Sequence, residues 1–339
     1  FTRLRQKFFD NCKYRGYSEE LTNEVWRQIE SFSGYSFCKA HSASFAVESF
    51  QSLYLKAYYP LEFMVAVINN FGGFYKSEFY FHEARMSGAT IMAPCVNHSH
   101  YLTTIEGDTI YIGLIHLNQM ERKLAHELVG QRARNGTFRS LEDFVCRVSA
   151  TSEQLDILIR IGAFRFTGKN KYELMWEKNA LLHAKSIPGF GATLFGEESE
   201  NFILPDLEEG PFDQAFDEIE LLGFPLCSPF SLVVSQDCSA CIEASRLGEY
   251  TSRIVHILGY FVCRKQVHTS KDQVMNFGTW IDESGDFFDT VHFPNSLRYF
   301  PFKGPGVYKI KGKVVLDFDF PSLEVLSMER LPYVKDERY

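Results

Sequence analysis

The sequence lacks long apolar runs. Its 339 residues are 45% hydrophobic and 15% aromatic, yet they contain no uninterrupted stretch of about 18 apolar residues, the length that a membrane-spanning helix needs. The first residues, Phe1 to Lys7, also lack the apolar stretch of a secretory signal peptide. We therefore expect a cytoplasmic protein, and the start at Phe1 rather than Met suggests a piece of a longer chain.

Paired cysteines are also scarce. The eight cysteines are scattered along a long chain, which indicates free thiols in a reducing compartment. The one CxxC motif, Cys238–Cys241, has no second pair and no nearby histidine. The pattern therefore does not favour a zinc site.

The chain has no overall excess of positive charge, since 35 Lys and Arg face 43 Asp and Glu. The acidity is concentrated in residues 186–248, which carry twelve Asp and Glu against a single Arg. The rest of the chain is slightly basic. It can therefore bind a nucleic acid through local patches while the acidic segment stays clear of it.

The length predicts two or three domains, and the first of them is helical. Ser18 is expected to cap a helix that ends at Gly34. A longer helix follows and is stopped by Pro60, and a shorter one covers residues 61–71. Three aromatic residues on the apolar stripes are expected to be packing residues and nothing more: Trp26, Phe50 and Phe63.

Lys39 and His41 stand at the start of the long helix. Free backbone N–H groups and the positive end of the helix dipole point there, so the two side chains would add positive charge to an anion site. The alternative is an ordinary helix cap with two solvated polar residues.

From Gly88 the pattern changes to short β-like runs at residues 90–92, 101–105 and 109–114, which predict a small sheet. Helical patterns return at residues 119–134 and 152–160. The run Ile161-Gly162-Ala163-Phe164, followed by a helix near Asn170, outlines a helix-hairpin-helix unit. There Gly162 would let backbone N–H groups approach a DNA phosphate. Gly162 is equally consistent with a plain helix C-cap.

Residues 186–248 indicate an exposed connector, rich in Pro, Gly and acidic residues. Two islands interrupt it. Residues 191–196 form a short apolar tip of the kind that docks in a partner's groove. Residues 216–222 are predicted to be a helix that packs back on the protein and ends at Gly223.

The last ninety residues contain five β-rich segments, at 255–262, 274–282, 287–293, 307–315 and 323–326. Five strands, with a glycine in the first and a hairpin between the second and third, fit an OB-fold barrel that takes single-stranded nucleic acid. Tyr260, Phe277 and Trp280 are possible stacking platforms, but we expect at least two of them to be barrel core.

Several motifs occur in a familiar order. They are Tyr35–Phe45 (YSFCKAHSASF), Lys56–Met64 (KAYYPLEFM), Ala84-Arg85, Pro94–Ser99 (PCVNHS), Gly113-Leu114, Leu158–Phe164 (LIRIGAF) and the terminal barrel segments. Together they resemble the C-terminal half of the bacterial DNA polymerase III alpha subunit, a C-family replicative polymerase. The resemblance covers nearly the whole chain.

The resemblance implies a multidomain α+β protein. Residues 1–88 would be the distal fingers, 89–185 a small β element with the helix-hairpin-helix DNA-binding region, 186–248 the connector with a clamp-binding peptide, and 249–333 the OB-fold domain. The implied partners are primer-template DNA, single-stranded template, deoxynucleoside triphosphates and the sliding clamp.

The resemblance also implies roles for particular residues. Lys39 and His41 would contact the nucleotide triphosphate or template phosphate. Arg160 and Gly162 would contact DNA, and Thr193, Leu194 and Phe195 the clamp. In the barrel, Arg264, Lys265 and Lys271 are the densest group of positive charges around the first turn, and we expect them to contact DNA. The family's metal-binding aspartates belong to a palm domain that would precede Phe1. We therefore expect Mg²⁺ to be held outside this chain and the isolated chain to be inactive.

The sequence departs from the family pattern in three places. Cys38 and Ala40 replace the usual Asn and Ser of the fingers motif, although Lys39 and His41 are kept. The first hairpin, Leu117–Met120, contains no glycine, and Gly191 stands where a Gln normally opens the clamp peptide. These changes suggest weak clamp binding and would suit a secondary, translesion-type copy.

The function expected from the sequence is therefore that of a polymerase fragment that positions nucleotide, template and clamp during replication. The alternative is a non-catalytic DNA-binding accessory protein of replication or repair, and a third possibility is a purely structural α+β protein. An Asp-x-Asp motif on a strand upstream of Phe1 would distinguish the first from the second.

Overall fold

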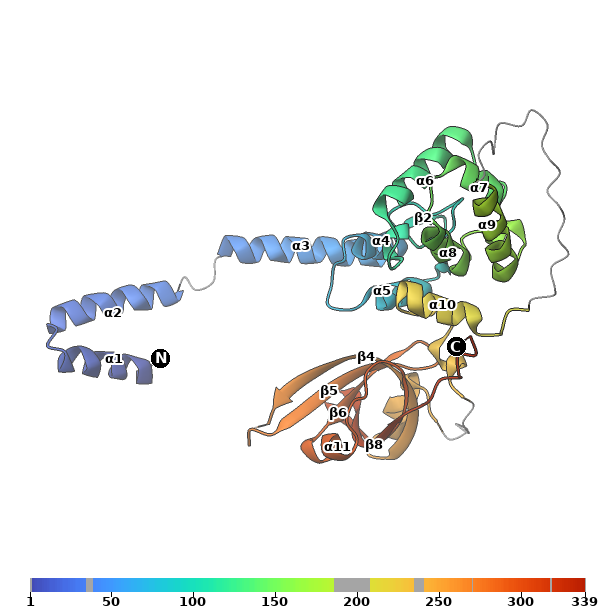
Figure 1. Cartoon of the computed structure of the whole chain (residues 1–339). Coiled ribbons are helices and arrows are strands. Elements are labelled where there is room, and N and C mark those ends of the chain that lie inside the picture. Colours follow the sequence, from blue (N-terminus) through green and yellow to red (C-terminus); the bar gives the residue numbers. More distant parts are fainter. Residues whose placement is uncertain are drawn as a thin grey trace. The chain divides into compact units, whose positions relative to one another are not determined.

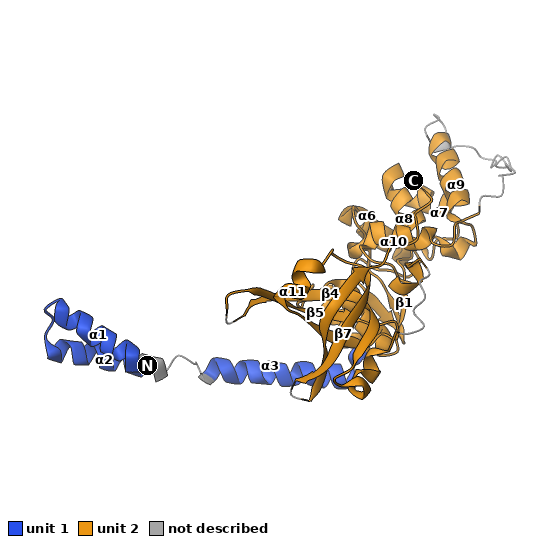
Figure 2. Ribbon diagram, turned by 90° about the horizontal axis from the view of Figure 1, so that it is seen from below, with its two compact units in different colours: residues 1–60 blue, residues 61–339 orange. Residues whose placement is uncertain are grey.

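The computed structural model describes residues 2–34, 39–185, 208–234, 241–269, 271–317 and 319–338. The chain divides into two compact units, residues 1–60 and residues 61–339 (Figure 2).

The first unit is helical. α1 (Thr2–Tyr14) and α2 (Glu19–Gly34) lie side by side, and Trp26 of α2 is buried against Phe8 and Phe9 (Figure 1). Ser18 caps α2 as predicted, because its Oγ accepts the amide of Leu21 at 3.2 Å. α3 (Lys39–Tyr58) is the long helix expected from the sequence.

The prediction that Phe50 is a packing residue is wrong. Its side chain on α3 is 75% exposed, and Phe45, Leu53 and Tyr58 on the same helix are also exposed. Helical spacing shows which residues share a face, but not whether another element covers that face. In the part of unit 1 that the structure describes, this face of α3 stays uncovered.

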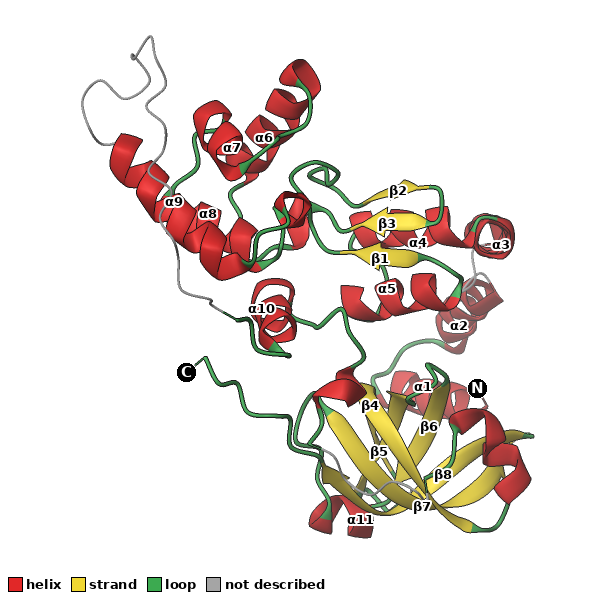
Figure 3. Ribbon diagram, turned by 90° about the vertical axis from the view of Figure 1, so that its right-hand side faces the viewer, coloured by secondary structure: helices red, strands yellow, loops and turns green. Residues whose placement is uncertain are grey.

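Unit 2 begins with two helices that pack on a small sheet (Figure 3). These are α4 (Pro60–Asn69) and α5 (Ser77–Met86), and the strands are β1 (Thr90–Met92), β2 (Thr104–Glu106) and β3 (Thr109–Tyr111). β3 lies in the middle, parallel to β1 and antiparallel to β2. Ile68, Phe81 and Ile110 share the core between them, and Phe63 is partly buried against it as predicted.

A helical layer follows the sheet. It contains the 3-10 helix η1 (Leu114–His116), α6 (Arg122–Asn135), α7 (Leu141–Arg147), α8 (Ser152–Arg160), η2 (Arg165–Thr167) and α9 (Lys171–Lys185). Its core is aromatic and aliphatic and includes Leu128, Phe144, Leu158 and Phe164. The Ser140 and Thr151 side chains cap α7 and α8.

α10 (Asp213–Leu222) packs on α8 and ends at Gly223, whose φ of +91° is left-handed, as the sequence predicted. The 3-10 helices η3 (Pro229–Leu232) and η4 (Ala244–Tyr250) lead into the barrel.

The last part is a closed five-stranded barrel with strand order β4-β5-β6-β8-β7. The strands are β4 (Ile254–His268), β5 (Val274–Ile281), β6 (Phe287–His292), β7 (Val307–Asp317) and β8 (Phe320–Arg330), and α11 (Pro294–Tyr299) lies between β6 and β7. β6 and β8 pair in parallel, and the other neighbours are antiparallel. This is the predicted OB-type arrangement.

The barrel core explains two features of the sequence. Gly259 of β4 is required because a Cβ there would stand 2.7 Å from the Phe288 ring. Trp280 is fully buried and donates from Nε1 to Thr290 Oγ1 at 2.7 Å. Tyr260 is also buried whereas Phe277 is 42% exposed, so the prediction that at least two of these three aromatic residues are core is confirmed.

Candidate nucleic-acid interface

The first hairpin of the helical layer forms without glycine. Gln119 has a φ of +63°, a left-handed conformation that glycine usually takes. The buried side chain of Gln154 on α8 holds this turn. Its Nε2 donates to the carbonyl oxygen of Gln119 at 2.8 Å, and its Oε1 accepts the amide of Glu121 at 2.9 Å. A side-chain amide from another helix thus fixes a turn that the sequence alone left in doubt.

This first hairpin leads into the N-terminus of α6, where no side chain caps the backbone. Arg122 and Lys123 occupy the first turn and are exposed. Arg122 lies 5.3 Å from the centre of the Tyr101 ring and donates from Nε to His126 at 3.3 Å. Backbone N–H groups, the helix dipole and two cations therefore coincide at one place, which favours an anion.

Other cations of the helical layer are used to hold loops. Arg132 donates to the carbonyl oxygens of Val96 and Ser99, and Arg165 donates to those of Ala93 and Pro94. Lys178 pairs with Asp156 at 2.5 Å. These side chains stabilise the layer and are not presented to a ligand.

The second hairpin uses its glycine as a helix cap. Gly162 has a φ of +72°, its amide donates to Ile159 at 2.9 Å, and the amide of Ala163 donates to Leu158 at 2.9 Å. Gln214 of α10 lies 3.9 Å from the position that a Cβ of residue 162 would occupy. Gly162 therefore ends α8 with its amide already bonded, and its predicted contact with DNA stays a prediction.

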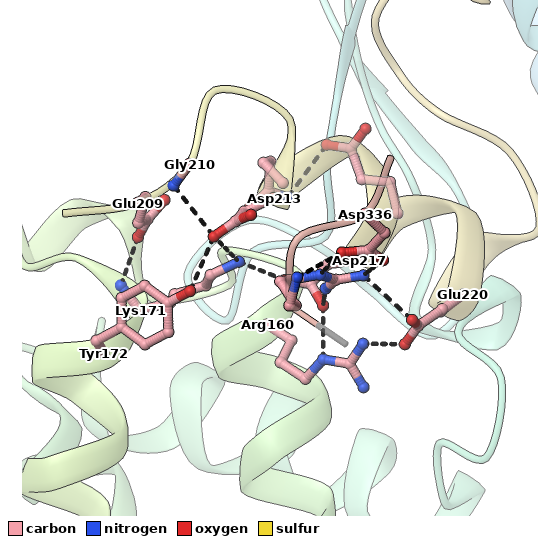
Figure 4. A network of polar contacts seen from close by, with 12 residues as sticks. Arg160, Lys171, Tyr172, Glu209, Gly210, Asp213, Asp217, Glu220 and Asp336 are labelled. Atoms are coloured by element: carbon pink, nitrogen blue, oxygen red, sulfur yellow. Dashed lines mark hydrogen bonds and ion pairs between the residues drawn. The ribbon is translucent and has the colours of Figure 1, made fainter. Parts of the chain in front are cut away.

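Arg160, the predicted DNA contact beside this hairpin, belongs to an ionic cluster centred on Asp217 of α10 (Figure 4). The Asp217 carboxylate is 1% exposed and accepts from Arg160 at 2.6 Å, Arg338 at 2.6 Å and Lys171 at 2.8 Å. Glu220 accepts a hydrogen bond from a second nitrogen of each arginine. Two cations from α8 and α9 and one from the C-terminal segment thus converge on one buried carboxylate.

The cluster shifts the pKa of two of its side chains, Arg160 and Tyr172. Burial acts to lower the pKa of Arg160, but the bonds to Glu220 and Asp217 outweigh it and raise that pKa. A hydrogen bond to Asp213 raises the pKa of Tyr172 to about 12. The sequence did not predict that Asp217 and Arg338 pair with Arg160. Their only signal was the acidic run that contains α10, because the partners lie far apart along the chain.

The barrel presents a different surface. Lys265 of β4 pairs in register with Phe277 of β5, and both side chains are exposed. Arg264 is also exposed and lies 5.7 Å from the centre of the Phe302 ring, while Lys271 stands in the turn between the two strands. A cation beside an exposed aromatic ring is suited to a phosphate and an adjacent base.

The remaining predicted residues lie elsewhere. Lys39 is the first residue of α3 in unit 1, and the exposed His41 ring meets Phe45 edge-on at 4.4 Å. Thr193, Leu194 and Phe195 lie outside the described residues. Arg264 and Lys265 are successive residues of β4, so their side chains leave opposite faces of the strand, and Arg160 and Gly162 lie at the C-terminal end of α8.

The fold and these surfaces define a multidomain α+β protein with a helix-hairpin-helix layer and an OB-type barrel. A family model described as a helix-hairpin-helix motif matches residues 88–174. This range contains both hairpins and the small sheet before them.

Relatives of known name cover more of the chain. A DNA polymerase III subunit alpha of Staphylococcus aureus is 28% identical over 87% of this chain and 28% of its own length. One from Aquifex aeolicus is 30% identical over 65% of this chain and 19% of its own. An error-prone DNA polymerase of Mycobacterium bovis is 30% identical over 56% of this chain and 18% of its own.

The chain is thus homologous to a C-terminal region of DNA polymerase III alpha subunits, as the motifs indicated, and it spans less than a third of the length of these relatives. Among solved structures, the second OB-fold domain of replication protein A from Methanococcus maripaludis is 11% identical, covers 25% of this chain and 91% of that domain, and has a TM-score of 0.19. The barrel assignment rests on its own strand order.

Two further observations concern the described residues only. None of their helices is long and apolar enough to cross a membrane. Nor do three or more of their His, Cys, Asp and Glu side chains gather in a way that could hold a metal ion.

Proposed function

We propose that this chain is the DNA- and nucleotide-positioning portion of a DNA-directed DNA polymerase of the III alpha type. The observation that carries the proposal is the match to a DNA polymerase III subunit alpha over 87% of this chain. In this chain a helix-hairpin-helix layer precedes an OB-type barrel. Both parts are of types that often contact nucleic acid.

The helical layer is proposed to contact duplex DNA mainly through the first hairpin. Arg122 and Lys123 are exposed at an uncapped helix start, where backbone N–H groups can meet a phosphate without reading sequence. Arg160 reaches DNA only if a phosphate displaces Asp217 and Glu220. Its predicted role therefore stays a prediction.

The barrel is proposed to guide the single-stranded template. Lys265, Arg264 and Lys271 supply the charge, and the exposed Phe277 ring supplies a stacking surface beside Lys265. Few phosphate contacts are available on this surface, so the affinity should be modest and without sequence preference.

Further parts of the proposal come from the resemblance. Lys39 and His41 would contact the nucleotide triphosphate or template phosphate, and Thr193, Leu194 and Phe195 would bind the sliding clamp. The resemblance also implies that Mg²⁺ would be held by palm aspartates outside this chain. A cytoplasmic location is part of the same proposal.

A titration of labelled single-stranded and duplex oligonucleotides with the 339-residue chain tests the proposal. Binding should weaken with salt, with a slope of about 0.7 per neutralised phosphate for the single strand. Arg264→Glu with Lys265→Glu should weaken single-strand binding about tenfold, the equivalent of about 1.4 kcal/mol. The matched control is Arg3→Glu with Lys7→Glu, which makes the same charge change on exposed residues of α1. Salt-independent binding, or equal affinity in both variants, would move the barrel to a protein-binding role.

A further inference from the structure

A cavity of about 370 Å³ lies within unit 2, away from both hairpins. Its walls come from α5, from residues 224–230 that follow α10, and from the turn 281–285 between β5 and β6. Its volume lies within the range of small-ligand pockets.

The walls combine polar side chains with an aromatic and aliphatic part. Phe79 is buried in α5 and lies 6.3 Å from the Tyr260 ring, and Phe230 and Ile281 pack in the same cluster. A flat or aliphatic body would lose its water against these rings, which is the main source of affinity in such a pocket.

Glu78 of α5 is the polar group that these walls leave incompletely paired. Its Oε1 accepts the hydroxyl of Tyr260 at 2.7 Å, and no other hydrogen bond to Glu78 occurs among the described residues. Burial raises the pKa of the Glu78 carboxyl, although the Tyr260 bond and the charge of Lys76 act against this. The Glu78 side chain is partly exposed, so its second carboxylate oxygen is accessible to a ligand.

The charges around the cavity favour a cation. Glu78, Asp282 and Glu283 line it, against one full positive charge on Arg85. Arg85 already donates to the carbonyl oxygen of Leu226 at 3.0 Å, and His82 Nε2 donates to that of Gly285 at 2.9 Å. Asp282 is satisfied by the amides of Ala244 and Asp286. Glu283 is exposed to solvent, so Glu78 is the less exposed of the two carboxylates open to a new partner.

We propose that this cavity binds a small organic cation with an apolar body. The charged end pairs with the open oxygen of Glu78, and the body packs against Phe79, Phe230 and Ile281. The site is distinct from the candidate nucleic-acid interface and does not depend on the function proposed above.

Benzamidine is a suitable probe, because it joins a flat ring to a fork of N–H donors, and titration calorimetry on the 339-residue chain gives the readout. Saturable one-to-one binding is expected. Benzamide, which is neutral, and benzoate, which is an anion, should bind at least tenfold more weakly.

Glu78→Gln keeps an acceptor for Tyr260 but removes the charge, and should weaken benzamidine binding at least tenfold. Glu83→Gln, on the same helix but outside the cavity lining, should not.

A second readout does not depend on a variant. Cys227 is exposed and lines the cavity, so bound benzamidine should slow its alkylation while exposed Cys146 reacts at an unchanged rate. Peptide mass spectrometry measures both rates. Absence of saturable binding, equal binding of benzoate, equal affinity in Glu78→Gln, or no protection of Cys227 would each overturn the proposal.

Discussion

The two hairpins of the helical layer show how little a glycine reveals about a binding surface. The second hairpin has the expected glycine, yet Gly162 closes a helix and its neighbour Arg160 is neutralised by Asp217 and Glu220 of α10. The first has none, yet Gln154 holds Gln119 in the left-handed conformation, and Arg122 and Lys123 remain exposed. Side chains that come from far along the sequence decide which hairpin is open.

The largest expected effect comes from removing the carboxylate that covers the second hairpin. Asp217→Ala would leave Arg160, Lys171 and Arg338 without their shared buried partner. It should cost about 3–5 kcal/mol in the free energy of unfolding, as breaking a buried ion pair does. Urea denaturation measures this loss.

The control for that variant is Glu177→Ala, which removes an ion pair to the half-exposed Lys169. It should cost less than about 1 kcal/mol. Similar losses for the two variants would mean that the cluster does not fix α10 to the helical layer.

Gln154→Leu should open the first hairpin. It removes two hydrogen bonds and leaves the carbonyl of Gln119 and the amide of Glu121 without them. We expect a loss of about 2 kcal/mol by urea denaturation, in the range for buried groups left unpaired. Gln273→Leu, on an exposed turn of the barrel, is the control and should change little. If Gln154→Leu leaves the free energy of unfolding unchanged, the Gln154 side chain does not hold the first hairpin.

Gly162→Ala tests the second hairpin. A side chain at a φ of +72° is strained, so the variant should lose about 1–2 kcal/mol of stability. Gly130→Ala inside α6 should instead gain stability, because alanine favours a helix interior. If both alanines stabilise the protein, residue 162 does not need its left-handed conformation.

Gln119→Gly is the counterpart in the first hairpin and should have the opposite sign. The residue already stands at a φ of +63°, so glycine should relieve strain and stabilise the chain by about 1 kcal/mol. Gln131→Gly in the interior of α6 should destabilise it by about 1 kcal/mol. Thermal unfolding distinguishes the two, and a loss in both would show that Gln119 is unstrained.

Local sequence signals predicted most of the secondary structure. Ser18, Pro60, Gly223 and Gly259 mark a helix start, a helix boundary, a helix end and a crowded strand, and each does so through its own geometry. The five strands followed from alternation and turns. β4 extends to His268, beyond the predicted end at residue 262. The prediction stopped short because the last residues of the strand are polar and lack the apolar pattern.

The misses share a physical cause, which is contact between distant segments. The exposure of Phe50 depends on what covers α3, and no pattern within α3 states it. The pairing of Asp217 with Arg160 and Arg338 joins residues 57 and 121 positions apart. In the candidate site, Arg264 and Lys265 were predicted because their charges are adjacent in sequence, whereas Arg122 and Lys123 were not, because their hairpin lacks glycine.

The most direct test of the account is a duplex-DNA titration of two variants side by side, by fluorescence anisotropy at fixed salt. Arg122→Glu with Lys123→Glu should lower the affinity about tenfold or more, since charge-assisted phosphate contacts are worth about 1.5–3 kcal/mol each. Arg160→Ala should change it less than about twofold, because a side chain already paired with two carboxylates adds little charge to the surface. A tenfold loss in Arg160→Ala together with normal binding by the Arg122 and Lys123 variant would contradict the account.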